Sequence, residues 1–224
     1  MKHVFALLLV IMLMCSLSAA AFAETGQSAF EVLPVAEPNP ENPFGVDMNV
    51  NMDSIDDYLK LSDAVYRDMR MPVDPYDYDA IGGSSIASAT IEGFAMIPYP
   101  KLAPCLNMPE ALGDGYDGPT LFSIDENGSY LANYAESEAI LERLFPKDKA
   151  ILLMCGAGGY AGMTRNLLVG LGWNGDMIIN VGGYWDYSGD RSLSVLSEDS
   201  GDGLYGFNGT EFYDIDFTHL TPAQ

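Results

Sequence analysis

The sequence of 224 residues predicts an α/β domain with a central parallel sheet that is flanked by helices on both faces. The apolar run Ile151–Cys155 is typical of a buried strand, and a loop of small residues leads from it into apolar positions with helical spacing at 163–169. Such strands alternate with helical patterns along the chain, which favours a parallel sheet with crossover helices. Asn127-Gly128, between two short apolar runs, predicts a hairpin inserted at 120–132.

The other elements follow from periodicity, capping residues and prolines. Helices are expected at 55–61, where Asp53 or Ser54 can cap the first turn, and at 136–145, where the pattern is amphipathic. Further strands are expected at 64–70, 91–97 and 177–181.

We expect four segments along the chain. Lys2, the apolar stretch 4–13 and a small-residue cleavage site at 21–23 predict a secretory signal peptide over 1–23, and therefore a location outside the cytoplasm. Residues 24–47 hold four prolines and little periodicity, which predicts a linker that is either laid over the domain or tethers it to a surface. The domain itself is placed at 48–190. A C-terminal extension at 191–224 is either a cover with aromatic anchors or a loose tail.

The acidic composition excludes some partners. Removal of 1–23, which contains one lysine and no acid, leaves nine basic and 32 acidic residues, and so a formal charge of −23. This charge repels nucleic acid and anionic membrane surfaces. No later stretch is long and apolar enough to cross a bilayer. We therefore expect no nucleic-acid partner and no membrane span, while the acidic and aromatic extensions leave a protein partner open.

Few side chains suit a metal ion. Asp74, Asp77 and Asp79 lie close together, but their spacing fits no calcium loop and indicates a solvated loop. After the signal peptide only His219 remains among the histidines. A histidine-rich metal site and a cysteine–histidine dyad are therefore not expected, and neither is a cofactor.

The cysteines are too few for a disulfide scaffold. Cys105 and Cys155 follow the signal peptide, and they could pair with each other. Cys15, within the signal peptide, raises a lipid anchor as an alternative, which the bulky Met14 before it disfavours.

The loop after Cys155 has the composition of an anion-binding turn. Glycines let successive backbone N–H groups turn inward, and the following helix adds the partial positive charge of its N-terminus. We therefore expect Cys155 to be a reactive nucleophile, with a pKa lowered from about 8.5 toward the neutral range. The alternative is a buried structural cysteine before an ordinary glycine-rich turn. The loop residues are Gly156, Ala157, Gly158, Gly159, Tyr160 and Ala161.

Five motifs over residues 50–187 occur in the order found in a known family. They are Asp68-x-Arg70, Ile91-Glu92-Gly93 through Ile97-Pro98, Cys155-x-x-Gly158, the helix end at 168–173, and Asn180-Val181-Gly182-Gly183 with Trp185. Together they resemble the rhodanese-like (sulfurtransferase) domain family, in an exported single-domain form.

The resemblance implies an α/β domain and a thiosulfate or polysulfide sulfurtransferase. Cys155 would accept a sulfane sulfur from a small donor as a persulfide and pass it to a thiol or another nucleophile. The N–H groups of 156–161 would hold the extra sulfur. Asp68 and Arg70 would be structural, joined by a salt bridge near the loop.

One departure from the family bears on the substrate. Family loops often carry a basic residue five positions after the cysteine, where this chain has Tyr160, and Arg165 lies further along the helix. A dianion such as thiosulfate would then meet only backbone dipoles in an acidic protein. We expect neutral or polymeric sulfur donors, or a protein persulfide, to fit better. The missing arginine also disfavours the phosphatase activity that the same fold hosts.

Two other functions remain open from the residues alone. The absent loop cation favours a non-catalytic binding module, which would use the extensions to bind a partner. A thiol redox protein would instead form a disulfide between Cys105 and Cys155.

Overall fold

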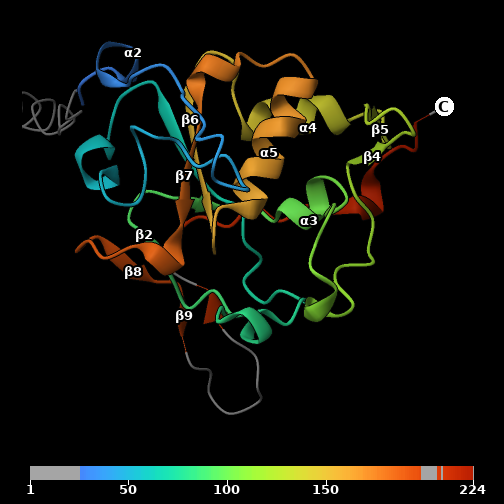
Figure 1. Cartoon of the computed structure of the whole chain (residues 1–224). Helices are drawn as coiled ribbons and strands as arrows, with labels where there is room; N and C mark the ends of the chain where they lie inside the picture. Colours follow the sequence, from blue (N-terminus) through green and yellow to red (C-terminus); the bar gives the residue numbers. More distant parts are fainter. Residues whose placement is uncertain (1–25, 198–205, 208, 224) are drawn as a thin grey trace, which may run out of the picture.

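A four-stranded parallel sheet forms the centre of the computed structural model, which describes residues 26–197, 206–207 and 209–223 (Figure 1). All residues of the two longest strands are buried, because both faces of the sheet are covered. The predicted α/β class, a parallel sheet flanked by helices, is confirmed. The strand order is β3 (Ala95–Met96), β1 (Ala64–Asp68), β6 (Ala150–Cys155), β7 (Ile178–Gly183).

Three helices cover one face of this sheet, where they bury the largest apolar cluster (Figure 1). The amphipathic stretch expected at 136–145 forms α4, and the last helix starts at Gly159, four residues before the first apolar position of its pattern. The indole N–H of Trp173 donates to the carbonyl of Phe145 at 2.7 Å and so joins the ends of the two longer helices. The helices are α3 (Tyr99–Leu102), α4 (Ser137–Leu144) and α5 (Gly159–Gly170).

The N-terminal segment, residues 26–61, covers the opposite face and appears in blue and cyan in Figure 1. It contains α2 (Ala29–Val32) and the 3₁₀ helix η1 (Ile55–Tyr58), which is shorter than the helix expected at 55–61. The backbone N–H of Asp47 donates to the carbonyl of Asn180 in β7 at 2.8 Å. The described part of the proline-rich segment is therefore laid over the domain. Residues 1–23, with the predicted signal peptide and Cys15, lie outside the described residues.

Among the described residues, three small antiparallel pairings lie outside the central sheet. The predicted hairpin is present as β4 (Phe122–Ile124) and β5 (Tyr130–Ala132), with Gly128 in the left-handed region at φ 81°. The strand expected at 91–97 is instead divided at Gly93, where φ is 93°. Ile91, the first residue of the expected strand, is the last residue of β2 (Ala89–Ile91). This strand lies outside the central sheet and pairs with β8 (Ser192–Ser194).

The described part of the C-terminal extension packs on the domain as a cover. Ile215 is buried, and Phe212 forms a parallel bridge with Met96 at the edge of the sheet. Within the described residues, no helix has the length and hydropathy that a membrane span requires. The remaining short elements are the third antiparallel pair, β9 (Leu196–Ser197) with β10 (Gly206–Phe207), and η2 (Tyr78–Ile81), η3 (Glu110–Leu112), η4 (Gly175–Met177), η5 (Tyr184–Asp186) and η6 (Phe217–His219).

A buried ion pair closes the carboxyl end of β1. Asp68 is fully buried, and its carboxylate accepts from Arg70 Nε at 2.9 Å, Arg70 Nη2 at 2.6 Å and Thr90 Oγ1 at 2.8 Å. Arg70 Nη2 also donates to the carbonyl of Ala89 at 2.7 Å. Both partners of the pair are therefore satisfied, and they fasten β2 to the central sheet.

We predict that Asp68→Ala lowers the free energy of unfolding by about 3–5 kcal/mol, because it leaves a buried guanidinium without its counter-ion. Urea denaturation measures the loss. The matched control is Lys149→Ala, which removes a partly exposed pair with Asp63 at 2.8 Å and should lower the free energy of unfolding far less. Equal losses in the two variants would contradict the structural role of the pair.

Candidate active site

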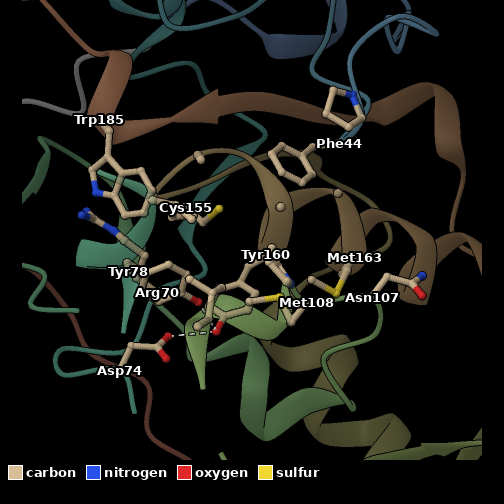
Figure 2. Close-up of a pocket in the computed structure, with 18 of the residues that line it drawn as sticks. Phe44, Arg70, Asp74, Tyr78, Asn107, Met108, Cys155, Tyr160, Met163 and Trp185 are labelled. Atoms are coloured by element: carbon tan, nitrogen blue, oxygen red, sulfur yellow. Dashed lines mark hydrogen bonds between the residues drawn. The ribbon is translucent and has the colours of Figure 1, made fainter. Parts of the chain in front are cut away.

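A cavity of about 570 Å³ lies at the edge of the sheet where β1, β6 and β7 end. Ligands of open α/β sheets bind at this edge, beyond the carboxyl ends of the strands. Cys155 is the last residue of β6 and lines the cavity, although only 3% of its surface is exposed. Figure 2 shows its sulfur between the side chains of Trp185 and Phe44.

Backbone N–H groups of the following loop are directed at the sulfur of Cys155. The N–H of Gly158 donates to Sγ at 3.1 Å, and those of Ala157 and Ala161 also favour the thiolate. Gly158 precedes the first residue of α5 and has a φ of 95°, a left-handed conformation that a side chain would strain. The glycine at this position therefore permits the turn that brings the amides to the sulfur.

The end of β7 holds this loop in place. A register shift between Leu153 and Met154 brings Gly183 opposite Cys155. A Cβ atom on Gly183 would lie 2.2 Å from the carbonyl oxygen of Gly156, so only glycine permits this approach. Two residues later, the N–H of Trp185 donates to the same carbonyl at 3.0 Å.

Asn180 is a positioning residue, although the sequence indicated it only as part of a motif and gave it no role. Its buried Nδ2 donates to the carbonyls of Phe44 at 2.9 Å and Gly158 at 3.1 Å, and its Oδ1 accepts from the N–H of Gly182 at 3.0 Å. It therefore joins the N-terminal segment, the loop and β7. A polar residue within the apolar strand expected at 177–181 was the available signal.

The expected lowering of the Cys155 pKa is wrong. Burial raises the pKa of the thiol, and the charge of Asp68 raises it further. The loop N–H groups act in the opposite direction, but they do not offset the loss of hydration. Burial therefore favours the thiol form of Cys155, while the donors that a thiolate requires already surround the sulfur.

The loop has Tyr160 where the resemblance would place a basic residue, and Arg70 is a cation that lines the same cavity. Its guanidinium lines the cavity and interacts electrostatically with Cys155, although its charge is paired with Asp68. Arg165 also lines the cavity, but it donates to the carbonyls of Ile178 at 3.1 Å and Gly175 at 3.2 Å. The sequence placed Arg70 in a structural role, and the ion pair is present as expected.

A chain of hydroxyl groups links the loop to a buried carboxylate. Tyr78 donates to the hydroxyl of Tyr160 at 2.6 Å, and Tyr160 donates to Asp74 Oδ2 at 2.9 Å (Figure 2). Asp74 is 7% exposed, so the expectation that it lies in a solvated loop is wrong. Burial raises the pKa of Asp74, against the hydrogen bonds from Tyr76 and Tyr160. Sequence alone could not pair groups 86 residues apart.

Cys105 is a second thiol near this chain. It is partly buried and interacts with Tyr160 and Asp74, and burial followed by the charge of Asp74 raises its pKa to about 12. Cys105 and Cys155 are both free thiols.

The six loop residues predicted from sequence fall into two groups, those that line the cavity and those that do not. Gly158 and Ala161 do not line the cavity, but their N–H groups favour the thiolate. Tyr160 stacks on Tyr99, with ring centroids 5.6 Å apart, and so also packs in the core. Those that line the cavity are Gly156, Ala157, Gly159 and Tyr160.

Comparisons of this chain with protein-family models, with curated proteins and with solved structures found no match. The resemblance to the rhodanese-like family therefore rests on the residues alone and stays a prediction. Among the described residues, no group of three or more histidine, cysteine or acidic side chains could hold a metal ion.

We predict that Asp74→Asn changes how stability depends on pH. Because the pKa of Asp74 is raised, its contribution is fully present below the unfolded pKa, near 3.8, and is lost as pH rises through the folded pKa. Asparagine does not titrate. The free energy of unfolding of the wild type, measured against that of the variant, should therefore fall from pH 4 to pH 7 in urea denaturation. A difference that stays constant with pH would contradict this.

Proposed function

We propose that the protein is an exported sulfurtransferase that forms a persulfide on Cys155 and passes the sulfane sulfur to a thiol. The observation that carries the proposal is the sulfur of Cys155, which lines a cavity at the carboxyl edge of the sheet and accepts the N–H of Gly158 at 3.1 Å. Export rests on the signal-like stretch at 1–23. The ordered motifs of the sequence support the same chemistry.

In the first step, the thiolate of Cys155 attacks the outer sulfur of a donor R–S–SH. A Cys–S bond forms while the donor S–S bond breaks, and R–S⁻ leaves with the electron pair. The proton released when Cys155 ionises ends on this leaving thiolate. The N–H groups of Ala157, Gly158 and Ala161 stabilise the attacking anion, and afterwards the persulfide, without needing to reorganise.

In the second step, an acceptor thiolate attacks the outer sulfur of the Cys155 persulfide. The S–S bond breaks, Cys155 leaves as a thiolate, and the acceptor carries the sulfur away as its own persulfide. No oxidant or reductant is consumed in either step. The loop N–H groups stabilise the negative charge that returns to the sulfur of Cys155, so the same amides act in both steps.

We predict that the purified protein gains the mass of one sulfur atom on Cys155 after treatment with a hydropersulfide donor. Cys155→Ser should abolish this adduct completely, because it removes the sulfur nucleophile that the loop N–H groups surround. Cys105→Ser is the control and should keep it. Intact-protein and peptide mass spectrometry locate the sulfur. An unmodified Cys155 with every donor would reject the proposed function.

We also predict an unusual pH dependence of persulfide formation. Because the pKa of Cys155 is raised, its thiolate fraction should still be rising where a cysteine blocked at both ends, with a pKa of about 8.5, levels off. The ratio of the Cys155 rate to the rate of this blocked cysteine removes the titration of the donor, and we expect this ratio to stay constant from pH 7 to pH 8 and to increase above pH 8.5. A ratio that falls as the pH rises would contradict a raised pKa.

The raised thiol pKa is the observation that favours a binding module as the second candidate. In that case ligands would occupy the cavity without sulfur transfer, and Cys155 would remain unmodified. A redox protein would instead yield a 105–155 disulfide under mild oxidation. The same mass spectra distinguish these outcomes from a single added sulfur.

A further inference from the structure

We propose, on the basis of the proposed sulfurtransferase function, that the cavity selects a sulfur donor whose organic group is apolar, uncharged and at least the size of an aromatic ring. The sequence led only to the expectation of a neutral or polymeric donor, because the loop lacks a cation. The structure adds walls, a volume and a charge distribution, which together define the organic group.

Aromatic rings and thioethers from segments distant in sequence form much of the apolar lining of the cavity (Figure 2). Aromatic rings offer flat apolar faces, and methionine adapts to irregular shapes and contacts ring edges favourably. A planar apolar group therefore complements this part of the lining. The aromatic and methionine side chains that line the cavity are Phe44, Met71, Tyr78, Met108, Tyr160, Met163 and Trp185.

Both arginines that line the cavity are already engaged by other groups. Arg70 is paired with Asp68, and Arg165 donates through Nε and Nη2 to two backbone carbonyls. Asp74 also lines the cavity and adds a carboxylate. A thiosulfate dianion would lose its hydration here and would have to compete with Asp68 for Arg70 and with the two backbone carbonyls for Arg165, which is costly.

The volume of the cavity also favours an organic donor over a small inorganic anion. Its volume, about 570 Å³, lies within the range of roughly 300–1,000 Å³ that is typical of pockets for drug-sized ligands. A small inorganic anion such as thiosulfate would leave most of the apolar wall in contact with water. A donor with an aromatic ring would displace that water, which is favourable where the water is poorly ordered.

The mouth of the cavity also carries exposed apolar side chains. Phe44 is 43% exposed and Leu106 is 50% exposed, and both line the cavity. The ring of Phe44 lies over Gly159, the first residue of α5. An apolar donor that reaches Cys155 would cover both side chains, so their burial would add to its affinity.

The test compares two donors with the same reacting sulfur, benzyl hydropersulfide and 4-carboxybenzyl hydropersulfide. Transfer to Cys155 of the full-length mature protein is followed by mass spectrometry, and each rate is divided by the rate for N-acetylcysteine. We expect the benzyl donor to be favoured at least about tenfold, because a carboxylate in the cavity would lose hydration. A ratio near one, with sulfur still transferred, would overturn this inference and leave the proposed function intact.

Leu106→Lys places a cation at the mouth, which attracts the 4-carboxybenzyl donor, and should reduce the preference for benzyl hydropersulfide several-fold. Leu131→Lys is the matched control, because Leu131 is 51% exposed on the hairpin and does not line the cavity. It should leave the ratio unchanged. Equal effects of the two substitutions would count against the cavity as the source of selectivity.

Calorimetric titration with benzyl thiol and 4-carboxybenzyl thiol, under reducing conditions, separates binding from transfer. Preferential binding of benzyl thiol without any sulfur adduct would support the apolar site and reject the proposed function. Absence of binding by both thiols, together with absence of an adduct, would reject both.

Discussion

The close approach of two backbones at the carboxyl edge of the sheet is the constraint on which the site depends. Gly183, at the end of β7, lies against the peptide of Gly156, where a single added carbon would overlap the carbonyl oxygen. The register shift in β7 produces this approach, and the N–H of Trp185 then holds the same carbonyl. With the loop fixed in this way, the left-handed turn at Gly158 points its N–H at the sulfur of Cys155. The position of the donors around the Cys155 sulfur is thus determined by backbone geometry.

The state of Cys155 follows from a competition between two effects of the same packing. Burying the loop under the N-terminal segment excludes water, which raises the pKa of the thiol, while it also fixes the amides that favour the thiolate. Burial has the larger effect. A thiol that ionises only during reaction is protected from unspecific oxidation, because the thiolate is the reactive form. Outside a reducing cytoplasm this protection would suit a cysteine without a disulfide partner.

Local patterns predicted much of the fold and the centre of the site. The strand at 151–155, the helix at 136–145, the hairpin around Gly128 and the loop after Cys155 all depend on neighbouring residues, and each is present. The pKa of Cys155 was predicted in the wrong direction, because composition does not reveal how deeply a loop is covered. Asn180 with Phe44, and Tyr160 with Asp74, are joined over 136 and 86 residues, and periodicity carries no information about such contacts.

The ion pair of Asp68 and Arg70 connects stability with the choice of substrate. Arg70 interacts with Cys155 and would be the natural anchor for an anionic donor, but Asp68 neutralises it and also accepts from Thr90. Releasing the guanidinium for an anion would require breaking the pair that fastens β2 to the sheet. Because an uncompensated buried charge is costly, the fold itself opposes anion binding beside the thiol. The apolar walls would then decide what occupies the cavity, so the selectivity that we propose for an uncharged donor would follow from how the edge of the sheet is stabilised.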